Sequence, residues 1–126
     1  MLNEERNKLF LQQAHCSITL RDLEERNVYL KMKLARVLAN NLERDQLAFL
    51  EAFQNRFLKH DGQITLLKHE VNELYMMIND LRDTNQLNAV AILREGIYNR
   101  INRTQLEFEN LNADFSNYLV HQFPGI

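Results

Sequence analysis

The chain has few of the residues that interrupt helices or tie loops together. Its 126 residues include three glycines, one proline and one cysteine, Cys16. Scarcity of Gly and Pro removes the main helix breakers and turn formers, so an all-β fold is disfavoured. A single cysteine excludes an internal disulfide, and nothing in the sequence requires an oxidising compartment.

An excess of one charge and long apolar runs are also missing. The formal net charge is -2 at pH 7, which argues against a protein that holds nucleic acid by bulk electrostatics. No uncharged apolar stretch approaches the ~20 residues that a membrane span needs. The first residues include Glu4, Glu5 and Arg6 instead of the apolar segment of a secretory signal. We therefore expect a soluble, cytoplasmic protein without membrane association.

What the sequence does contain is a seven-residue apolar repeat in three separate runs. Each run, called a seam here, follows alternating steps of three and four residues, which keeps its members on one face of an α-helix. The first seam consists of Leu9, Cys16, Leu20, Leu23, Leu30, Leu34 and Val37. The second consists of Leu50, Phe53, Phe57, Ile64, Leu67, Val71, Leu74, Ile78 and Leu81. The third consists of Leu87, Val90, Ile97, Ile101, Phe108, Leu111, Phe115 and Tyr118.

Two short polar breaks separate the seams, and the seam changes phase at each of them. At the first break, Asn40 or Asn41 can cap the next helix. Asn40 and Glu43 also have the spacing of a capping box, in which an N-terminal cap residue and a residue three positions later satisfy free backbone amides. At the second break, Asp83 and Gln86 have the same spacing, and Thr84 is an equally good cap. Both breaks therefore predict the start of a new helix.

The fold class predicted from this pattern is all-α, an antiparallel bundle of three long helices. Short connections force consecutive long helices to run antiparallel. The expected helices cover about 5–38, 42–82 and 86–122, in one domain of residues 1–126. The outline resembles spectrin-type three-helix repeats and small helical secretion chaperones. The chain lacks the tryptophan that spectrin-type repeats usually carry in the core, so no family is assigned from it.

Gly62 is the position that bears most on the number of helices. Asp61-Gly62 is typical of a turn, and Gly costs a helix interior about 1 kcal/mol relative to Ala. The seam nevertheless keeps its register through Phe57, His60 and Ile64, and Gly62 falls opposite the seam. We favour one long second helix; the alternative is a four-helix bundle with a turn near Gly62.

Residues with chemical potential are scattered and form no recognised catalytic or metal-binding motif. His60 is the only histidine on a seam, and the sequence has neither His-Glu-x-x-His nor Glu-x-x-His. Cys16 also lies on a seam, where a small buried hydrophobe is the favoured interpretation. We expect no enzyme activity, no cofactor, no metal and no small-molecule substrate. Whether His60 or Cys16 does more than pack stays open.

Four seam positions are polar, and one stretch is locally basic. Asn27 suits a residue that fixes register and helix partners at some cost in stability. Arg94 is expected to lay its aliphatic stem on the core and its charge in water; the other two polar positions are Gln13 and Thr104. Residues 26–44 hold five cations and one acid, a pattern that can follow phosphates, so nucleic acid is a third-ranked and unlikely partner.

A second set of apolar residues falls outside the seams on the first and third helices. A three-helix bundle has no internal use for positions opposite the seam, so their alignment favours a contact with another chain. The predicted partner interface consists of Leu11, Ile18, Val28, Met32, Ile92, Leu106 and Val120. The expected function is a structural or interaction module that self-associates, most simply as a dimer. The alternative is a helical chaperone or adaptor that holds another helical protein.

Overall fold

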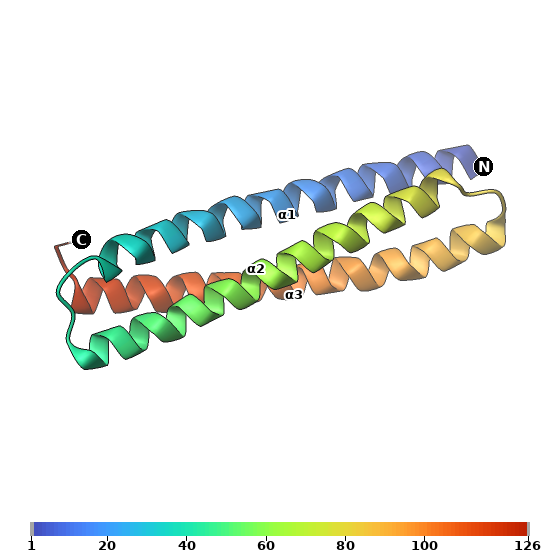
Figure 1. The fold of residues 1–126 in the computed structure, drawn as a ribbon. Coiled ribbons are helices and arrows are strands. Elements are labelled where there is room, and N and C mark those ends of the chain that lie inside the picture. The colour runs from blue at the N-terminus through green and yellow to red at the C-terminus, as the bar shows by residue number, and fades with distance from the viewer. Residues whose placement is uncertain (1, 126) are drawn as a thin grey trace.

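The computed structural model describes residues 2–125, which form three long helices joined by two short connections. Helix α1 spans Leu2–Leu38, α2 spans Arg44–Asn79 and α3 spans Thr84–Gln122. The helices lie side by side, up, down and up, so that α1 and α3 run in the same direction (Figure 1). The predicted all-α three-helix bundle is confirmed, and residues 2–125 contain no strand. Met1 and Ile126, the ends of the predicted domain, lie outside the described residues.

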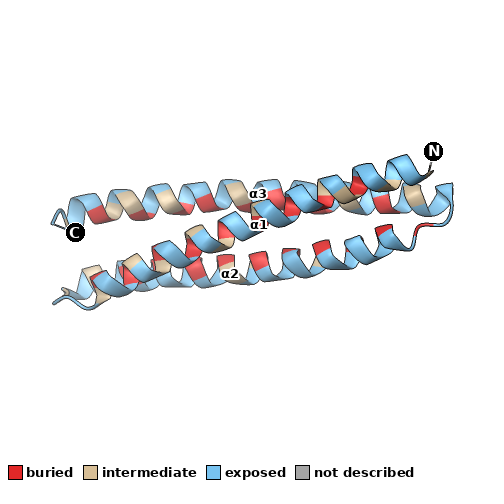
Figure 2. Cartoon of the chain, turned by 90° about the horizontal axis from the view of Figure 1, so that it is seen from above, coloured by how far each residue is buried: buried red, intermediate tan, exposed pale blue. Residues whose placement is uncertain are grey.

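The seams form the core of the bundle. Every residue of the first and second seams is buried, and Figure 2 shows buried residues recurring along the inner faces of the helices. At the ends of the third seam, Leu87 and Tyr118 are only half-buried, and Leu119 is buried where Tyr118 was expected. A repeat of 3.5 residues drifts by about 20° per heptad against a helix of 3.6 residues per turn, so four heptads move the buried face by about one position.

Helix α2 is continuous through Gly62, as predicted, which excludes the four-helix alternative. Gly62 is exposed, and a Cβ built on it would meet no atom within 4 Å. The missing side chain therefore leaves no hole in the core. Gly96 occupies an equivalent exposed position in α3 and also has open space around it.

The predicted helix boundaries are wrong by two to three residues at several ends. At the first break the capping box lies three residues later than predicted. Glu43 itself is the N-cap of α2, and its backbone N–H donates to Oε1 of Gln46 at 3.0 Å. Asn40 follows the end of α1, and its side-chain Nδ2 donates to the carbonyl oxygens of Arg36 and Val37. The last carbonyls of a helix lack partners within it, and Asn40 satisfies two of them.

At the second break the predicted cap is confirmed, although the helices end and begin earlier than expected. The carboxylate of Asp83 accepts a hydrogen bond from the backbone N–H of Gln86 at 2.8 Å. The Gln86 side chain accepts from the backbone N–H of Arg82, not from Asp83 as a strict capping box requires. Leu81 lies outside α2 and is still buried, and its carbonyl accepts a hydrogen bond from the Arg6 guanidinium. This contact ties the start of α1 to the α2–α3 connection.

Candidate functional site

All seven residues of the predicted partner interface are exposed. On α1, Leu11 and Ile18 are 74% and 60% exposed, and Val28 and Met32 are also exposed. On α3, Ile92, Leu106 and Val120 are 74%, 68% and 67% exposed. None of these side chains is used by the core of the described chain. The helix phases read from the seams therefore place these residues on the surface, as expected.

These residues form two separate rows, one on each helix. The α1 row is Leu11, Ile18 and Met32, with Val28 beside it toward α2; the α3 row is Ile92, Leu106 and Val120. Each row lies opposite the buried face of its own helix and so points away from the axis of the bundle. Because α1 and α3 occupy different corners of the bundle, the two rows point in different directions. One flat partner surface cannot cover both.

Sequence reasoning missed an apolar hollow between α2 and α3. A cavity of about 340 Å³ is lined mainly by Leu74, Met77, Ile92, Leu93 and Ile97, with Glu70 and Arg100 at one end. Met77 and Leu93 are each about half exposed, and each is next in the sequence to a seam position. That flanking position is the signal that was available, because residues beside a seam face the groove between neighbouring helices.

Near the middle of the bundle, polar side chains join α1 to α2. The side-chain nitrogen of Asn27, which is fully buried, donates to Oδ1 of Asp61 and to the backbone oxygen of Phe57 at 3.3 Å. The other carboxylate oxygen of Asp61 pairs with the ammonium of Lys31 at 2.5 Å. The predicted role of Asn27 in fixing the register of α1 against α2 agrees with these contacts. Gln13 makes a similar bond to the backbone oxygen of Val71 at 2.9 Å.

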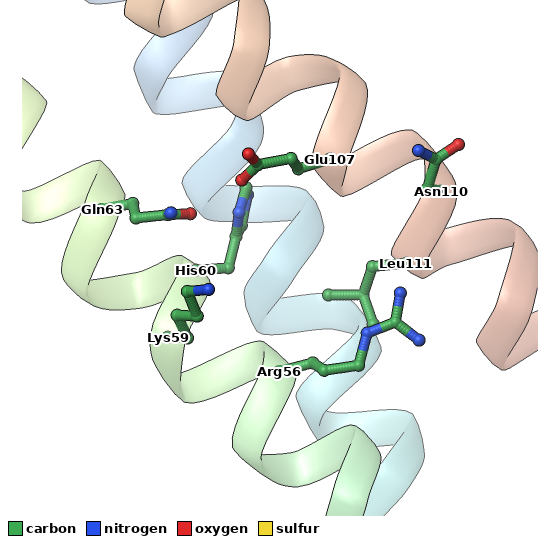
Figure 3. A pocket seen from close by; sticks show the side chains of 7 residues that line it. All are labelled: Arg56, Lys59, His60, Gln63, Glu107, Asn110 and Leu111. Atoms are coloured by element: carbon green, nitrogen blue, oxygen red, sulfur yellow. The ribbon is translucent and has the colours of Figure 1, made fainter.

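His60 is buried on its seam beside a small polar hollow. Its ring lies 5.0 Å from that of Phe108 between centroids, and its Nε2 has no hydrogen-bond partner among residues 2–125. The hollow, about 240 Å³, brings together the ends of Lys59, Gln63 and Glu107 near the imidazole (Figure 3). Burial lowers the pKa of His60, although the negative charges of Asp61 and Glu107 oppose the shift. The ring is therefore held neutral near pH 7.

Cys16 is almost completely buried. Burial raises the pKa of its thiol, an effect that the charge of Arg94 partly offsets. A protonated, inaccessible thiol is a poor nucleophile and metal ligand, so the packing interpretation of Cys16 agrees with the structure. Arg94 is half-buried and places its guanidinium 5.3 Å from the ring centre of Tyr98, so its charge rests against an aromatic face.

The basic stretch 26–44 is already partly neutralised within the chain. Arg26 pairs with Glu109 of α3 at 2.7 Å and approaches Asp22 at 3.9 Å. Lys31 is held by Asp61, as described above. Two of the five cations are therefore engaged with carboxylates, which weakens the field available to a phosphate backbone.

Neither a metal cluster nor a membrane span occurs in the part of the chain that the structure describes. No three His, Cys, Asp or Glu side chains within residues 2–125 lie close enough together to hold a metal ion. None of the three helices there combines the length and apolarity needed to cross a bilayer. Comparisons with family models, with curated proteins and with solved structures gave no match to this chain.

Proposed function

We propose that this chain is a non-enzymatic interaction module that associates with a second copy of itself through the outer apolar surface of α1 and α3. Because the two rows point in different directions, either row can form the contact. The observation that carries this proposal is the exposure of both rows along two adjacent long helices. Exposed apolar side chains are common singly, but rows repeated at helical spacing are typical of surfaces that another chain covers. A pair of identical chains is the simplest assembly, because a two-fold contact uses the same surface twice.

The same proposal places the module in the cytoplasm. Its one cysteine is buried and needs no partner, so the fold requires no oxidising compartment. The charged side chains between the apolar rows keep such an assembly in solution.

Sedimentation velocity with paired variants tests the proposal. We expect the unmodified protein to sediment as a dimer at tens of micromolar, and the variant Ile18→Glu with Leu106→Glu to be a folded monomer. A buried carboxylate at the contact costs several kcal/mol, whereas the same side chain in the free chain is solvated. An unmodified protein that is monomeric at this concentration would contradict self-association.

A matched control exists on the helix that the proposal leaves out. Leu58 and Met76 of α2 are 55% and 66% exposed, close to the values for Ile18 and Leu106. The variant Leu58→Glu with Met76→Glu makes the same chemical change at similarly exposed positions. It should remain dimeric, and circular dichroism should show both double variants to be as helical as the unmodified protein.

The cavity between α2 and α3 supports a second candidate, a chaperone or adaptor that holds an amphipathic helix of another protein. Its apolar lining and charged rim are what a helix-in-groove complex uses. This candidate predicts that Met77→Glu with Leu93→Glu abolishes co-purification of a partner from the native host while leaving the oligomeric state unchanged. A variant that keeps its partner would contradict the second candidate, and loss of self-association in that variant would place the contact between copies at the cavity instead of at the outer rows.

A further inference from the structure

The outer row of α3 has the same order of large and small side chains when it is followed from either end. Its positions, seven residues apart, are Ile92, Asn99, Leu106, Ala113 and Val120, all exposed. Leu106 stands at the centre, a large apolar residue stands at each end, and a smaller residue stands between on each side. Building on the self-association proposed above, we infer that α3 of a second copy covers this row. The two helices run antiparallel about a two-fold axis at Leu106.

Such a pairing matches side chains along the whole row when the two α3 helices coil gently about each other. This coiling compensates the drift of about 20° per heptad that a seven-residue row shows on a straight helix. The axis places Leu106 against its own counterpart and Ile92 against Val120 of the second copy at both ends. The matched residues at the two ends are 28 positions apart, which is about 42 Å of helix at the α-helical rise. An isologous contact requires a surface that complements itself in this way. The pairing also brings Asn99 opposite Ala113, which leaves room for the amide.

The charges of α3 favour the antiparallel direction. Residues 84–103 contain three arginines and one glutamate, whereas residues 104–122 contain three acids and no Lys or Arg. Arg100, Glu109 and Asp114 are paired with α1 or α2 of the same chain. The charges that remain still differ in sign, since two arginines and one glutamate are left in the first half and Glu107 is left in the second. Antiparallel pairing therefore sets a basic half against an acidic half at both ends. Parallel pairing would set like halves together, which is unfavourable. The charges of the two halves thus favour antiparallel over parallel pairing of the apolar row.

The side chains that flank the row are compatible with the same axis. A two-fold axis normal to the helix pair brings each edge of α3 against the same edge of the second copy. On one edge Arg103 comes level with Asn110, and on the other Glu109 comes level with Asn102. Neither edge sets two like charges at the same level. Arg103 meets an amide oxygen that can accept from it, and Glu109 keeps its pair with Arg26 of its own chain.

The row on α1 lacks this self-complementarity. Its seven-residue positions are Leu11, Ile18, Glu25 and Met32. An antiparallel copy that sets Ile18 against Met32 sets Glu25 against itself at the axis, and shifting the register by one heptad buries Glu25 against Ile18. Antiparallel pairing of α1 with α3 of a second copy fails on charge, because residues 26–38 of α1 contain four cations and no acid and would meet the basic half of α3. Parallel pairing of α1 with α3 would match the charges but would bury Glu25 against Leu106 or Ala113. Of the two rows, α3 therefore carries the contact between copies.

Oxidative cross-linking at introduced cysteines tests the arrangement. The native Cys16 is buried, so the unmodified protein serves as a blank. The variant Leu106→Cys should form a disulfide-linked dimer on mild oxidation, because the axis brings the two introduced side chains within the Cα separation of a disulfide, about 4.4–6.8 Å. The variant Ile18→Cys, on α1 and similarly exposed, should stay unlinked.

The ends of the row distinguish the two directions. A mixture of Ile92→Cys and Val120→Cys chains should give a linked heterodimer, and Ile92→Cys alone should give none. Linkage of Ile92→Cys to itself would overturn the antiparallel arrangement. Sedimentation velocity provides a second measurement that needs no introduced cysteine. In it, Leu106→Glu should be a monomer and Ile18→Glu should remain a dimer.

The outcomes separate this inference from the proposed function. If the unmodified protein sediments as a dimer while Leu106→Cys stays unlinked and Leu106→Glu stays dimeric, the α3 contact is wrong and self-association survives through another surface. If the unmodified protein is monomeric, both the α3 contact and self-association are wrong. A linked dimer from Leu106→Cys and from the mixture, with none from Ile18→Cys, supports both.

Discussion

At the scale of single residues, buried polar groups carry most of the specificity inside this bundle. Asn27 and Gln13 each donate across a helix interface to a backbone oxygen, and Oδ1 of Asn27 and Oε1 of Gln13 have no partner among the described residues. A buried oxygen without a partner costs free energy, so neither residue is there to maximise stability. Their bonds form only in one register of α1 against α2. An apolar residue at either position would permit sliding by a heptad.

His60 gives the protein a pH-dependent stability. Its pKa in the folded protein lies below the ordinary value near 6.5, so the unfolded chain binds a proton at a higher pH than the folded chain does. Stability from this residue is therefore complete above about pH 6.5 and falls as the pH decreases below it, by at most about 1.4 kcal/mol per pH unit. We expect the free energy of unfolding in urea to decrease from pH 7 to pH 5.

The variant His60→Leu isolates this contribution. It removes the buried titrating group and should flatten the decrease between pH 7 and pH 5. His15→Leu is the matched control, since His15 is exposed on α1 and its replacement should leave the decrease unchanged. A decrease that persists unchanged in His60→Leu would mean that the burial of His60 does not set the acid response.

At the scale of helices, the sequence predicted the paths of all three elements but not where they end. The seams are long and periodic, and the free energy gained by burying them is many times the local cost of Gly62. The helix therefore continues through Asp61-Gly62, although this dipeptide is typical of a turn. Helix ends depend on one or two hydrogen bonds between interchangeable polar residues. Glu43 is an unusual N-cap and Asn40 an ordinary one, yet the structure uses Asn40 to close α1. N-cap propensity alone could not predict that Glu43, and not Asn40, caps α2.

Replacing the helix glycines tests whether α2 is an ordinary helix through Gly62. Gly62→Ala should raise the free energy of unfolding by about 0.5–1 kcal/mol, because Ala has less backbone freedom to lose and its Cβ meets open space. Thermal unfolding followed by circular dichroism measures the gain, which should be a few degrees in midpoint (roughly 2–8 °C). Gly96→Ala in α3 provides the comparison and should give a similar gain. A loss at Gly62 alone would indicate a hinge there.

At the scale of the whole molecule, charge supports the same topology as the seams do. The basic end of α1 lies beside the acidic end of α3, and the ion pair of Arg26 with Glu109 joins them. Two further ion pairs, Arg56 with Asp114 and Arg100 with Glu70, join α3 to α2. Each such exposed pair contributes only about 0–1 kcal/mol, so together they select the arrangement more than they stabilise it. The sequence could place the apolar rows outside, but periodicity within one chain does not state which chain covers them.

The core is divided into two buried clusters, which raises the question of whether the bundle unfolds as one unit. One cluster surrounds Phe57 and Phe115 near the α1–α2 connection, and the other surrounds Leu74 near the α2–α3 connection. The buried Thr104 lies between Ile101 of one cluster and Phe108 of the other. All three helices run without a break through both clusters. Opening one end would leave long helices without packing partners and exposed to solvent, where they are only marginally stable. We therefore expect a single cooperative unfolding transition.

Two cavity variants, one in each cluster, test this cooperativity. Leu74→Ala should cost about 2–5 kcal/mol and Phe115→Ala about 3–5 kcal/mol. In a Leu106→Glu background, which removes the proposed association, hydrogen exchange should show each variant lowering the opening free energy of amides near both Phe57 and Leu74 by a similar amount. Protection that falls only in the cluster carrying the substitution would show that the two ends of the bundle open independently. Cooperative behaviour would instead mean that a change at either end is felt along the whole length of α3, including the row around its centre.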